Sequence, residues 1–455
     1  MIAIVGGGIA GLSAAYELSI RNVPFTLFES SSRLGGLIRT EHEGGFTIEA
    51  GADSMLAQKR AGLDLCTELG LESRLIAPTA PRTAFVLHRG VLHPLPVPAM
   101  LGIPATWTGL ATYSLLTPMA RARIGLEPFV PAPRDQCDES IASFFARRFG
   151  AASVDYLAQP LLGGIHAGAV DRLSVMALFP RLVAAERAAP RVLRWIRTSA
   201  KTPSSGGAFR SLVSGMSELV EGIRRRIPAA SVRCDTAVVG LNRTDHGWRI
   251  TTAAGSSDHS AVILACPAHT AATLLRSTDH QAAELCAAVP YVSTVSVALA
   301  WPRPAVAHPL NGSGFVVARK SNAVRITAAT WVSSKWEGRA PTGHVLLRAY
   351  LGGQHDPAAV DQEDATLVEF AVRELSAILS ITGRPELARV YRWRNAGAQH
   401  EVGHLARMAA LDERLAALGA LYATGSGFRS IGIPDCVADG RAVAARASAN
   451  PTAID

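Results

Sequence analysis

Three glycines near the N-terminus have the residue type and spacing that phosphate binding requires. Gly6, Gly8 and Gly11 form a Gly-x-Gly-x-x-Gly motif. Gly6 allows a tight turn, Gly8 lets a pyrophosphate approach the backbone, and Gly11 lets a helix pack closely on a strand. Glu29 follows eighteen residues after Gly11, where an acid can accept hydrogen bonds from both hydroxyls of a ribose. Together these residues predict a dinucleotide-binding site rather than a glycine turn of purely structural origin.

The residues around the motif predict a βαβ unit that positions it. The apolar run 2–5 is typical of a buried parallel strand, residues 12–19 have the spacing of a helix, and residues 23–28 predict a second strand. The helix N-terminus then directs backbone N–H groups and a positive dipole end at the phosphates. Because the first strand begins at residue 2, we expect no leader peptide.

The rest of the chain contains both helical and strand patterns. Residues 135–200 predict helices, with Asp138 and Ser140 as candidate N-caps, and a polar connector follows at 200–208. Strand patterns occur within 231–300 and 312–352, a helix at 367–379, a strand at 421–423 and a last helix at 434–447.

The composition excludes several classes of protein. Of the 455 residues, 48% are hydrophobic and 18% charged, so the chain can bury enough apolar surface to fold. The net charge of +8 comes almost entirely from Arg, and no compact basic run with interleaved aromatic residues occurs, so we expect no nucleic-acid partner. The six Cys residues are dispersed without a Cys-x-x-Cys pair, which argues against disulfides and favours the cytoplasm.

One uncharged segment raises the question of membrane contact. Residues 90–120 contain no Asp, Glu, Lys or Arg, but five Pro residues interrupt them, so we do not expect a spanning helix. The segment either lies against a membrane surface, lines an apolar substrate site, or forms an irregular part of the core.

The residues after Glu29 distinguish between dinucleotides. Arg33 stands two residues before Gly35 and Gly36, and this extended fingerprint resembles the flavin amine oxidase and desaturase superfamily. In that superfamily the segment passes along the pyrophosphate and the flavin, so the resemblance implies non-covalent FAD. A second Gly-x-Gly-x-x-Gly motif in strand context, expected for a nicotinamide domain, does not occur. Molecular oxygen or a quinone is therefore the expected electron acceptor.

The C-terminal segment contains Gly425 and the run Gly432, Ile433 and Pro434. These residues resemble the closing flavin-binding motif of the oxygen-dependent porphyrinogen oxidases of haem synthesis. Pro434 suits a first helical turn, whose N-terminus can face the flavin atoms that gain negative charge on reduction. The chain departs from the family pattern at Ser426, where Asn is usual, and at His166, where Tyr or Phe is usual.

Further matching blocks extend this resemblance over nearly the whole chain. They imply that the backbone of Val238 meets the adenine, that Trp393 packs on the flavin, and that a carbonyl near Gly164 contacts the substrate. Arg82 is a candidate partner for a substrate propionate, since Arg pairs with carboxylates through two hydrogen bonds, or else a solvated loop residue. Asp53 either lies near the flavin or caps a helix. The blocks are 159–168, 173–180, 209–216, 234–238, 331–341, 352–353 and 392–404.

Other classes of protein stay open as alternatives. His400 to His404 fit the His-Glu-x-x-His pattern of zinc proteases, but Gly403 weakens a helix and no third ligand is near, so we expect no metal site. An amine oxidase would share the N-terminal motif but would need an aromatic pair near the C-terminal one. A carotenoid desaturase would have a different C-terminal glycine motif. A scaffold protein of the haem pathway would take up no flavin.

The resemblance implies an α/β fold with three parts. A discontinuous Rossmann-like FAD-binding domain would comprise residues 1–72, 206–283 and 396–455. A sheet-containing substrate domain would comprise 73–90 and 284–395, and a helical, membrane-facing part 91–205.

The expected reaction is the FAD-dependent oxidation of a porphyrinogen to the porphyrin with oxygen as acceptor. The apolar segment 90–120 favours protoporphyrinogen IX, which we take first, whereas the high Arg content favours the alternative, coproporphyrinogen III. Expected partners besides substrate and oxygen are the inner face of the cytoplasmic membrane, as a peripheral contact, and a ferrochelatase that takes the product.

Overall fold

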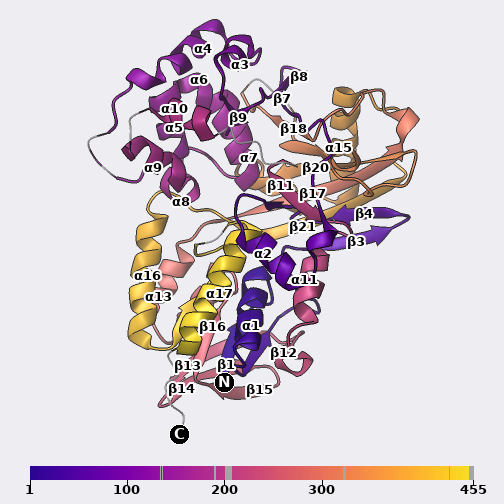
Figure 1. Ribbon diagram of the computed structural model, residues 1–455. Helices are drawn as coiled ribbons and strands as arrows, with labels where there is room; N and C mark the ends of the chain where they lie inside the picture. The colour runs from indigo at the N-terminus through magenta and orange to yellow at the C-terminus, as the bar shows by residue number, and fades with distance from the viewer. Residues whose placement is uncertain are drawn as a thin grey trace.

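The strand predicted at residues 2–5 is the centre of a parallel sheet. β1 (Ile2–Val5) pairs with β2 (Phe25–Phe28) on one side and β16 (Ala261–Leu264) on the other, in the order β12-β2-β1-β16-β22. β2 begins two residues later than predicted, after Pro24, which has no N–H for the ladder. The outer strands are β12 (Val232–Arg233) and β22 (Leu421–Ala423), so the sheet joins distant parts of the chain (Figure 1).

Alternate residues of β1 enter two different cores. Ile2 and Ile4 pack with α1 (Ile9–Ile20) and α17 (Ile433–Ala449), whereas Ala3 and Val5 face α12, α13, α16 and an antiparallel meander. The remaining elements around this sheet are α2 (Ala61–Glu68), α11 (Ser217–Arg224), β13 (Val238–Thr244), β14 (Gly247–Thr252), β15 (Gly255–His259), α12 (Ala268–Leu275), α13 (His280–Ala287) and α16 (His404–Leu418).

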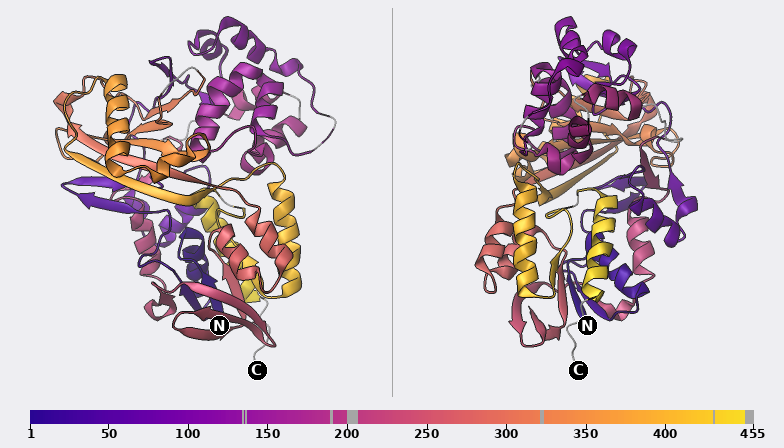
Figure 2. Two further views of the ribbon diagram at one scale, coloured as in Figure 1. Left: turned by 180° about the vertical axis from the view of Figure 1, so that it is seen from behind. Right: turned by 60° about the vertical axis from the view of Figure 1, so that its left-hand side comes forward.

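A seven-stranded mixed sheet stands above the parallel one. Its order is β21-β17-β20-β19-β18-β7-β8, and only β18 and β7 pair in parallel. Helix α15 (Asp364–Leu379) covers one face, while the other face meets the hairpin β3–β4 (Figures 1 and 2). The strands are β3 (Thr40–Glu43), β4 (Phe46–Glu49), β7 (Ala84–His88), β8 (Val91–Pro94), β17 (Tyr291–Pro302), β18 (Gly314–Val317), β19 (Ala328–Trp331), β20 (His344–Gly352) and β21 (Leu387–Ala398).

Short helices from the middle of the chain form a third, separate core. The predicted cap Ser140 accepts a hydrogen bond from Ser143 N at 3.1 Å, whereas Asp138 instead accepts from Ser174 and from Gly403 N. The buried carboxylate of Glu127 pairs with Arg148 and accepts the first N–H groups of α10. The helices are α3 (Trp107–Thr112), α4 (Pro118–Gly125), α5 (Ile141–Phe149), α6 (Ala151–Ser153), α7 (Gly164–His166), α8 (Val175–Leu178), α9 (Pro180–Ala188) and α10 (Val192–Ser199).

One helical segment of this region departs from α geometry. Val154–Gly163 is a π-helix with Pro160 inside it, where the missing N–H and the ring are incompatible with a regular α ladder. It leads directly into α7, which lies between the helical region and the seven-stranded sheet (Figure 1).

The structure, a computed structural model, describes residues 1–133, 135, 137–188, 191–199, 207–320, 324–429 and 431–449. Most of the predicted connector 200–208 lies outside these residues. Within them, no helix combines the length and the apolar character that crossing a bilayer demands. The helical region lies at the end of the molecule opposite the N-terminus (Figure 2).

The remaining short elements connect these three regions. They are β5 (Met55–Leu56), β6 (Leu75–Ile76), β9 (Ala99–Met100), β10 (Ile103–Pro104), β11 (Phe209–Leu212), α14 (Val332–Lys335) and the 3₁₀ turns η1 (Glu72–Arg74), η2 (Glu127–Phe129), η4 (Ala229–Ser231), η5 (Arg303–Ala305), η6 (Gly353–His355) and η7 (Pro357–Asp361).

Candidate active site

The N-terminal glycine motif forms a turn with open space at one position. Gly6 has φ +112° and stands so close to Ala265 that a Cβ would lie 2.7 Å from its carbonyl oxygen. A Cβ on Gly11 would overlap the carbonyl oxygen of Gly6. At Gly8, by contrast, no heavy atom of the described residues beyond its own neighbours in the chain lies within 4 Å of where a Cβ would stand. The turn is therefore tight on the protein side and open at the N-terminus of α1.

Glu29 closes β2 directly beside this turn. Its Oε2 accepts a hydrogen bond from Gly7 N at 2.7 Å, and its Oε1 accepts from the N–H and the hydroxyl of Ser31 at 2.8 and 2.7 Å. These bonds fix the carboxylate at the edge of the turn. A carboxylate offers about four acceptor positions, and the hydroxyls of Ser30 and Ser31, which occupy two of them at 3.4 and 2.7 Å, are the donors that ribose hydroxyls would replace.

The segment with Arg33, Gly35 and Gly36 folds over the turn. Gly35 N donates to Gly7 O at 2.8 Å, and a Cβ on Gly36 would lie 3.1 Å from the Cα of Gly8. The guanidinium of Arg33 donates to the carbonyls of Gly36 at 2.6 Å and Ile38 at 3.1 Å. Arg33 thus fixes the shape of the loop around the glycine turn.

The C-terminal motif reaches the same place from the other end of the chain. A Cβ on Gly425 would lie 3.5 Å from the Cβ of Ala10 in α1. Gly432 precedes α17, and Ile433 and Pro434 form its buried first turn, with Pro at a position where no N–H is needed. The N-termini of α1 and α17 therefore lie at one end of the parallel sheet, where ligands of α/β folds bind.

Trp393 and Val238 extend this site in two directions. The indole N–H of Trp393 donates to Ala50 O at 3.0 Å, and a Cβ on Gly51 would lie 3.2 Å from its ring. Val238 begins β13 two residues after Thr236, whose N–H donates to Glu29 O at 2.8 Å. Trp393 lies in the seven-stranded sheet, and Val238 follows the segment that is bonded to Glu29.

A buried group of charges holds the segment 49–53 against the upper sheet. Arg348 donates to the carbonyls of Glu49 at 2.6 Å and Gly51 at 2.9 Å. Asp53 pairs with Lys335 at 3.0 Å and Arg348 at 3.4 Å, rather than capping a helix. Burial alone would raise the pKa of Asp53, but these two cations outweigh it and hold that pKa well below its ordinary value.

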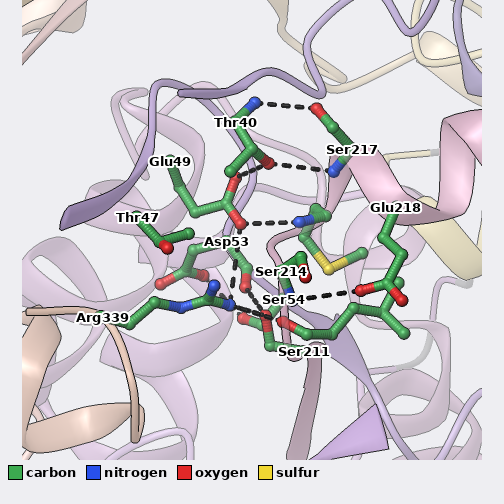
Figure 3. Close-up of polar contacts among 12 residues, drawn as sticks. Thr40, Thr47, Glu49, Asp53, Ser54, Ser211, Ser214, Ser217, Glu218 and Arg339 are labelled. Carbon is green, nitrogen blue, oxygen red and sulfur yellow. Dashed lines mark hydrogen bonds and ion pairs between the residues drawn. The ribbon is translucent and has the colours of Figure 1, made fainter. Parts of the chain in front are cut away.

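A second buried arginine joins three segments below this group. Arg339 donates to Ser211 Oγ at 3.0 Å (Figure 3). It also donates to the carbonyls of Leu212 and Val213 at 2.8 and 3.1 Å. The Glu49 carboxylate accepts from Met216 N at 2.7 Å and from Thr40. Burial raises the pKa of Glu49. These contacts make the wall beside Gly51 rigid.

The sequence also contains an indication of this buried group of charges that the motifs do not include. Arg348 stands in the middle of an apolar strand, and Lys335 is one of only four lysines in the chain. A cation inside an apolar run is buried only with partners, so it predicts a nearby carboxylate or carbonyl cluster.

The zinc-protease motif forms a different structure. The rings of His400 and His404 stack with centroids 3.8 Å apart, and their Nε2–H groups donate to the carbonyls of Ser426 at 2.9 Å and Phe428 at 2.6 Å. Among the described residues no group of three His, Cys, Asp or Glu side chains could hold a metal ion. The two histidines instead hold the loop that precedes α17.

The residues expected on the substrate side lie apart from one another. Gly164 begins α7, with Val316 of β18 3.9 Å from where its Cβ would stand. Arg82 precedes β7; its Nε donates to Pro78 O at 2.9 Å, and its side chain lies against Gly207. His166 lies edge-on to Phe179, and burial, with His400 and Lys59 nearby, lowers its pKa to about 4.

The arrangement around Gly8 fits FAD. The open position at Gly8 leaves room for a pyrophosphate at a helix N-terminus, Glu29 stands where the ribose would come, and α17 points its N-terminus toward the other end. Fold and site together define a dinucleotide-binding flavoprotein oxidoreductase.

Comparisons with known proteins agree with this class. The family model described as flavin containing amine oxidoreductase matches residues 9–448. The coproporphyrinogen III oxidase of Bacillus subtilis (strain 168) is 34% identical over 97% of this chain and 96% of its own. A crystal structure named for a protoporphyrinogen oxidase of Exiguobacterium sp. 255-15 covers 99% of both chains with a TM-score of 0.87 and 30% identity. Protoporphyrinogen oxidase 2 of Arabidopsis thaliana is 24% identical over 96% of this chain and 92% of its own.

The chain belongs to the flavin containing amine oxidoreductase family, and within it to the porphyrinogen oxidases. The resemblance seen in the sequence is confirmed, and FAD is the cofactor of this enzyme.

Proposed function

We propose that this enzyme uses FAD to oxidise coproporphyrinogen III to coproporphyrin III in haem synthesis. The similarity over the full length to a coproporphyrinogen III oxidase is the observation that supports this most directly. The sequence alone placed protoporphyrinogen IX first and coproporphyrinogen III second. The relatives named coproporphyrinogen III oxidase are more similar to this chain than the plant protoporphyrinogen oxidase, so they reverse that order.

The residues of the chain would divide the work of binding FAD. Gly8 and the N-terminus of α1 would hold the pyrophosphate, Glu29 the ribose, and the backbone near Val238 the adenine. Gly432 and the N-terminus of α17 would face the end of the flavin that gains negative charge. Trp393, held by Ala50, would form one wall of the flavin pocket.

Besides binding FAD, the chain must position the substrate. When bound, FAD supplies hydride acceptance in each of three two-electron oxidations, with molecular oxygen taking the electrons as hydrogen peroxide. The segment around Gly164 and the facing strands β18–β20 would hold the macrocycle between the helical region and the upper sheet. Arg82 stays a candidate partner for a propionate, by its charge and its place before β7.

The function is tested with both porphyrinogens prepared without oxygen. Each is mixed with the purified holoenzyme and air, and porphyrin fluorescence is followed against a sample without enzyme. Faster formation of coproporphyrin than of protoporphyrin supports the proposal. Faster formation of protoporphyrin selects the second substrate. No acceleration of either, in a protein whose absorbance shows bound FAD, contradicts the porphyrinogen function and directs attention to amines and polyenes.

We also propose that the enzyme is cytoplasmic and touches the inner face of the membrane through its helical region. Five large apolar side chains within 97–129 are exposed: Val97, Trp107, Met119, Leu126 and Phe129. The only acid of the segment 91–130, Glu127, is fully buried in its pair with Arg148. The exposed face is therefore apolar and basic, which suits an anionic lipid surface.

The poor solubility of the porphyrin product suggests that a second protein receives it directly. A porphyrin is flat, apolar and poorly soluble, so its release beside a ferrochelatase at the same membrane surface would avoid loss to water. We propose this transfer to a ferrochelatase. We also propose that the chain is divided into FAD-binding, substrate and helical parts.

A further inference from the structure

A small recess lies between the π-helix and the seven-stranded sheet. Gln159 and Gly164 line it from the helical side, and Arg319, Thr327 and His355 from the sheet. Its volume is about 20 Å³. Since roughly 10–15 Å³ is needed for one water, the recess has room for about one carboxylate oxygen but not for a porphyrin ring.

The guanidinium of Arg319 reaches this recess with an unused donor. Its Nη1 donates to Val324 O at 3.2 Å, while its Nη2 is buried and has no hydrogen-bond partner among the described residues. Buried polar groups in native proteins almost always have partners, so an orphaned donor at a recess marks a place for an acceptor.

The acids near Arg319 are already engaged by another arginine. Arg325 pairs with Asp356 at 2.7 Å, and its backbone N–H donates to both carboxylate oxygens of Glu374 at 3.0 Å. None of the residues that line the recess is Asp or Glu. Asp356 and Glu374 attract Arg319 without forming an ion pair with it among the described residues, and burial still lowers the pKa of Arg319.

His355 adds a second observation of the same kind. The amide nitrogen of Gln159 lies 2.8 Å from its Nε2, so this ring nitrogen accepts and the ring is held in place. Burial lowers the pKa of His355, and the charge of Arg319 lowers it further. His355 is therefore neutral, and a negative group entering the recess would meet the charge of Arg319 alone.

We propose that this recess binds one propionate carboxylate of the porphyrinogen, with Arg319 as its charged partner. The inference rests on the proposed function and names a contact for that same substrate. Gly164, which the family resemblance places at the substrate, lines the recess, so a propionate arm can enter it while the ring stays outside. Coproporphyrinogen III carries four propionates and protoporphyrinogen IX two, so an additional cation of this kind favours the former.

The test measures binding rather than turnover. The holoenzyme and the variant Arg319→Gln are titrated with the stable product coproporphyrin III, and the Kd is read from fluorescence quenching. Loss of one charge-assisted pair predicts about a tenfold rise in Kd. The neighbour Lys320→Gln is the matched control, because Lys320 points to Asp155 at 2.6 Å and not into the recess. It removes the same charge and should leave Kd unchanged.

The tetramethyl ester of coproporphyrin separates a carboxylate contact from a general packing effect. Wild type and Arg319→Gln should bind the ester equally, since it offers no charged group. Should Arg319→Gln fail to hold FAD, Arg319→Lys serves instead, with a smaller loss because the charge stays but the planar fork is gone. An unchanged Kd for coproporphyrin III in either variant overturns the subsite while wild-type oxidation of the porphyrinogen still stands. A wild-type enzyme that neither binds nor oxidises any porphyrin overturns the proposed function, and the subsite with it.

Discussion

The proposed role of Gly8 is to leave room for the cofactor, and the fold itself does not require glycine at this position. Its φ of −69° is accessible to any residue, and the space beside it is open. Gly6 has positive φ, and a Cβ on it would lie 2.7 Å from the carbonyl oxygen of Ala265, so the backbone itself requires glycine here. The two glycines of the same motif therefore have separable roles.

Substitution Gly8→Ala should weaken FAD binding without weakening the apoprotein. The added methyl group occupies the space at the helix N-terminus, and overpacking of about 1–3 kcal/mol raises the Kd of FAD by one to two orders of magnitude. Flavin titration of apoprotein measures this, and urea unfolding of apoprotein should give a midpoint at or slightly above that of wild type. Gly6→Ala is the contrast, since it should lower that midpoint. A Gly8→Ala protein with wild-type FAD affinity would place the pyrophosphate elsewhere.

Residue types indicate the candidate cofactor-binding residues more readily than the residues that support them. The glycines, Glu29 and Arg33 are recognisable because backbone conformation and phosphate geometry restrict them to few residue types at fixed spacing. Arg348 and Arg339 hold backbone carbonyls of segments far away in the sequence, and such pairing depends on the tertiary fold. Asp53 had two interpretations, and only the position of Lys335 and Arg348 distinguishes them.

Among the elements, helices α16 and α17 are joined through the stacked histidines. His404 opens α16, and His400 precedes it, yet both bind carbonyls of the loop that leads into α17. Burial lowers the pKa of His404 to about 3, helped by His400, Arg407 and Arg429. Each ring is therefore neutral in the folded protein at neutral pH.

This pair predicts a loss of stability on acidification. In the unfolded chain His404 becomes protonated below about pH 6.5, whereas in the folded protein it stays neutral down to about pH 3. The free energy of unfolding therefore falls as the pH is lowered. Between pH 7 and 5 the loss is about 2 kcal/mol for this one group. His404→Gln can still donate to Phe428 O but cannot titrate, so its stability should fall less over the same range. Urea unfolding of both holoproteins with equal excess FAD at pH 7 and pH 5 measures the difference, and parallel losses would contradict it.

Elements with a simple period were predicted closely, and irregular ones were not. The apolar run 421–423 is β22 with the same bounds, and α17 starts within one residue of the predicted 434. The π-helix Val154–Gly163 has no such signal, because its apolar residues fit any helix and Pro160 alone does not say how the ladder will be broken. The sequence also gives no clear prediction for residues 90–120, because Pro and Gly interrupt any periodic pattern and the segment forms short elements and turns.

At the scale of the whole molecule, the charge and apolar surface are unevenly placed. Within the helical region, the segment 97–129 carries strongly exposed apolar side chains. Val97 is 82% exposed, Met119 83% and Phe129 82%. The helical region lies at the end opposite the N-terminus (Figures 1 and 2). Exposed apolar groups gathered at one end of the molecule are what a peripheral contact with lipid requires.

The double variant Met119→Ser/Phe129→Ser should therefore bind anionic vesicles more weakly than wild type. Each side chain contributes at most about 1.5–3 kcal/mol when fully buried in lipid, so even partial insertion predicts at least about a tenfold fall in partitioning. Sedimentation with phosphatidylglycerol vesicles measures it, and neutral phosphatidylcholine vesicles should bind less because they lack the charge that attracts arginine. The matched control is Ile20→Ser/Leu405→Ser, which removes two exposed apolar side chains from α1 and α16 of the FAD-binding region. Equal loss of binding in both double variants would show a general effect of surface hydrophobicity and contradict a specific contact. If the wild type does not bind vesicles, the proposed membrane contact is wrong, but the proposed oxidase activity is unaffected.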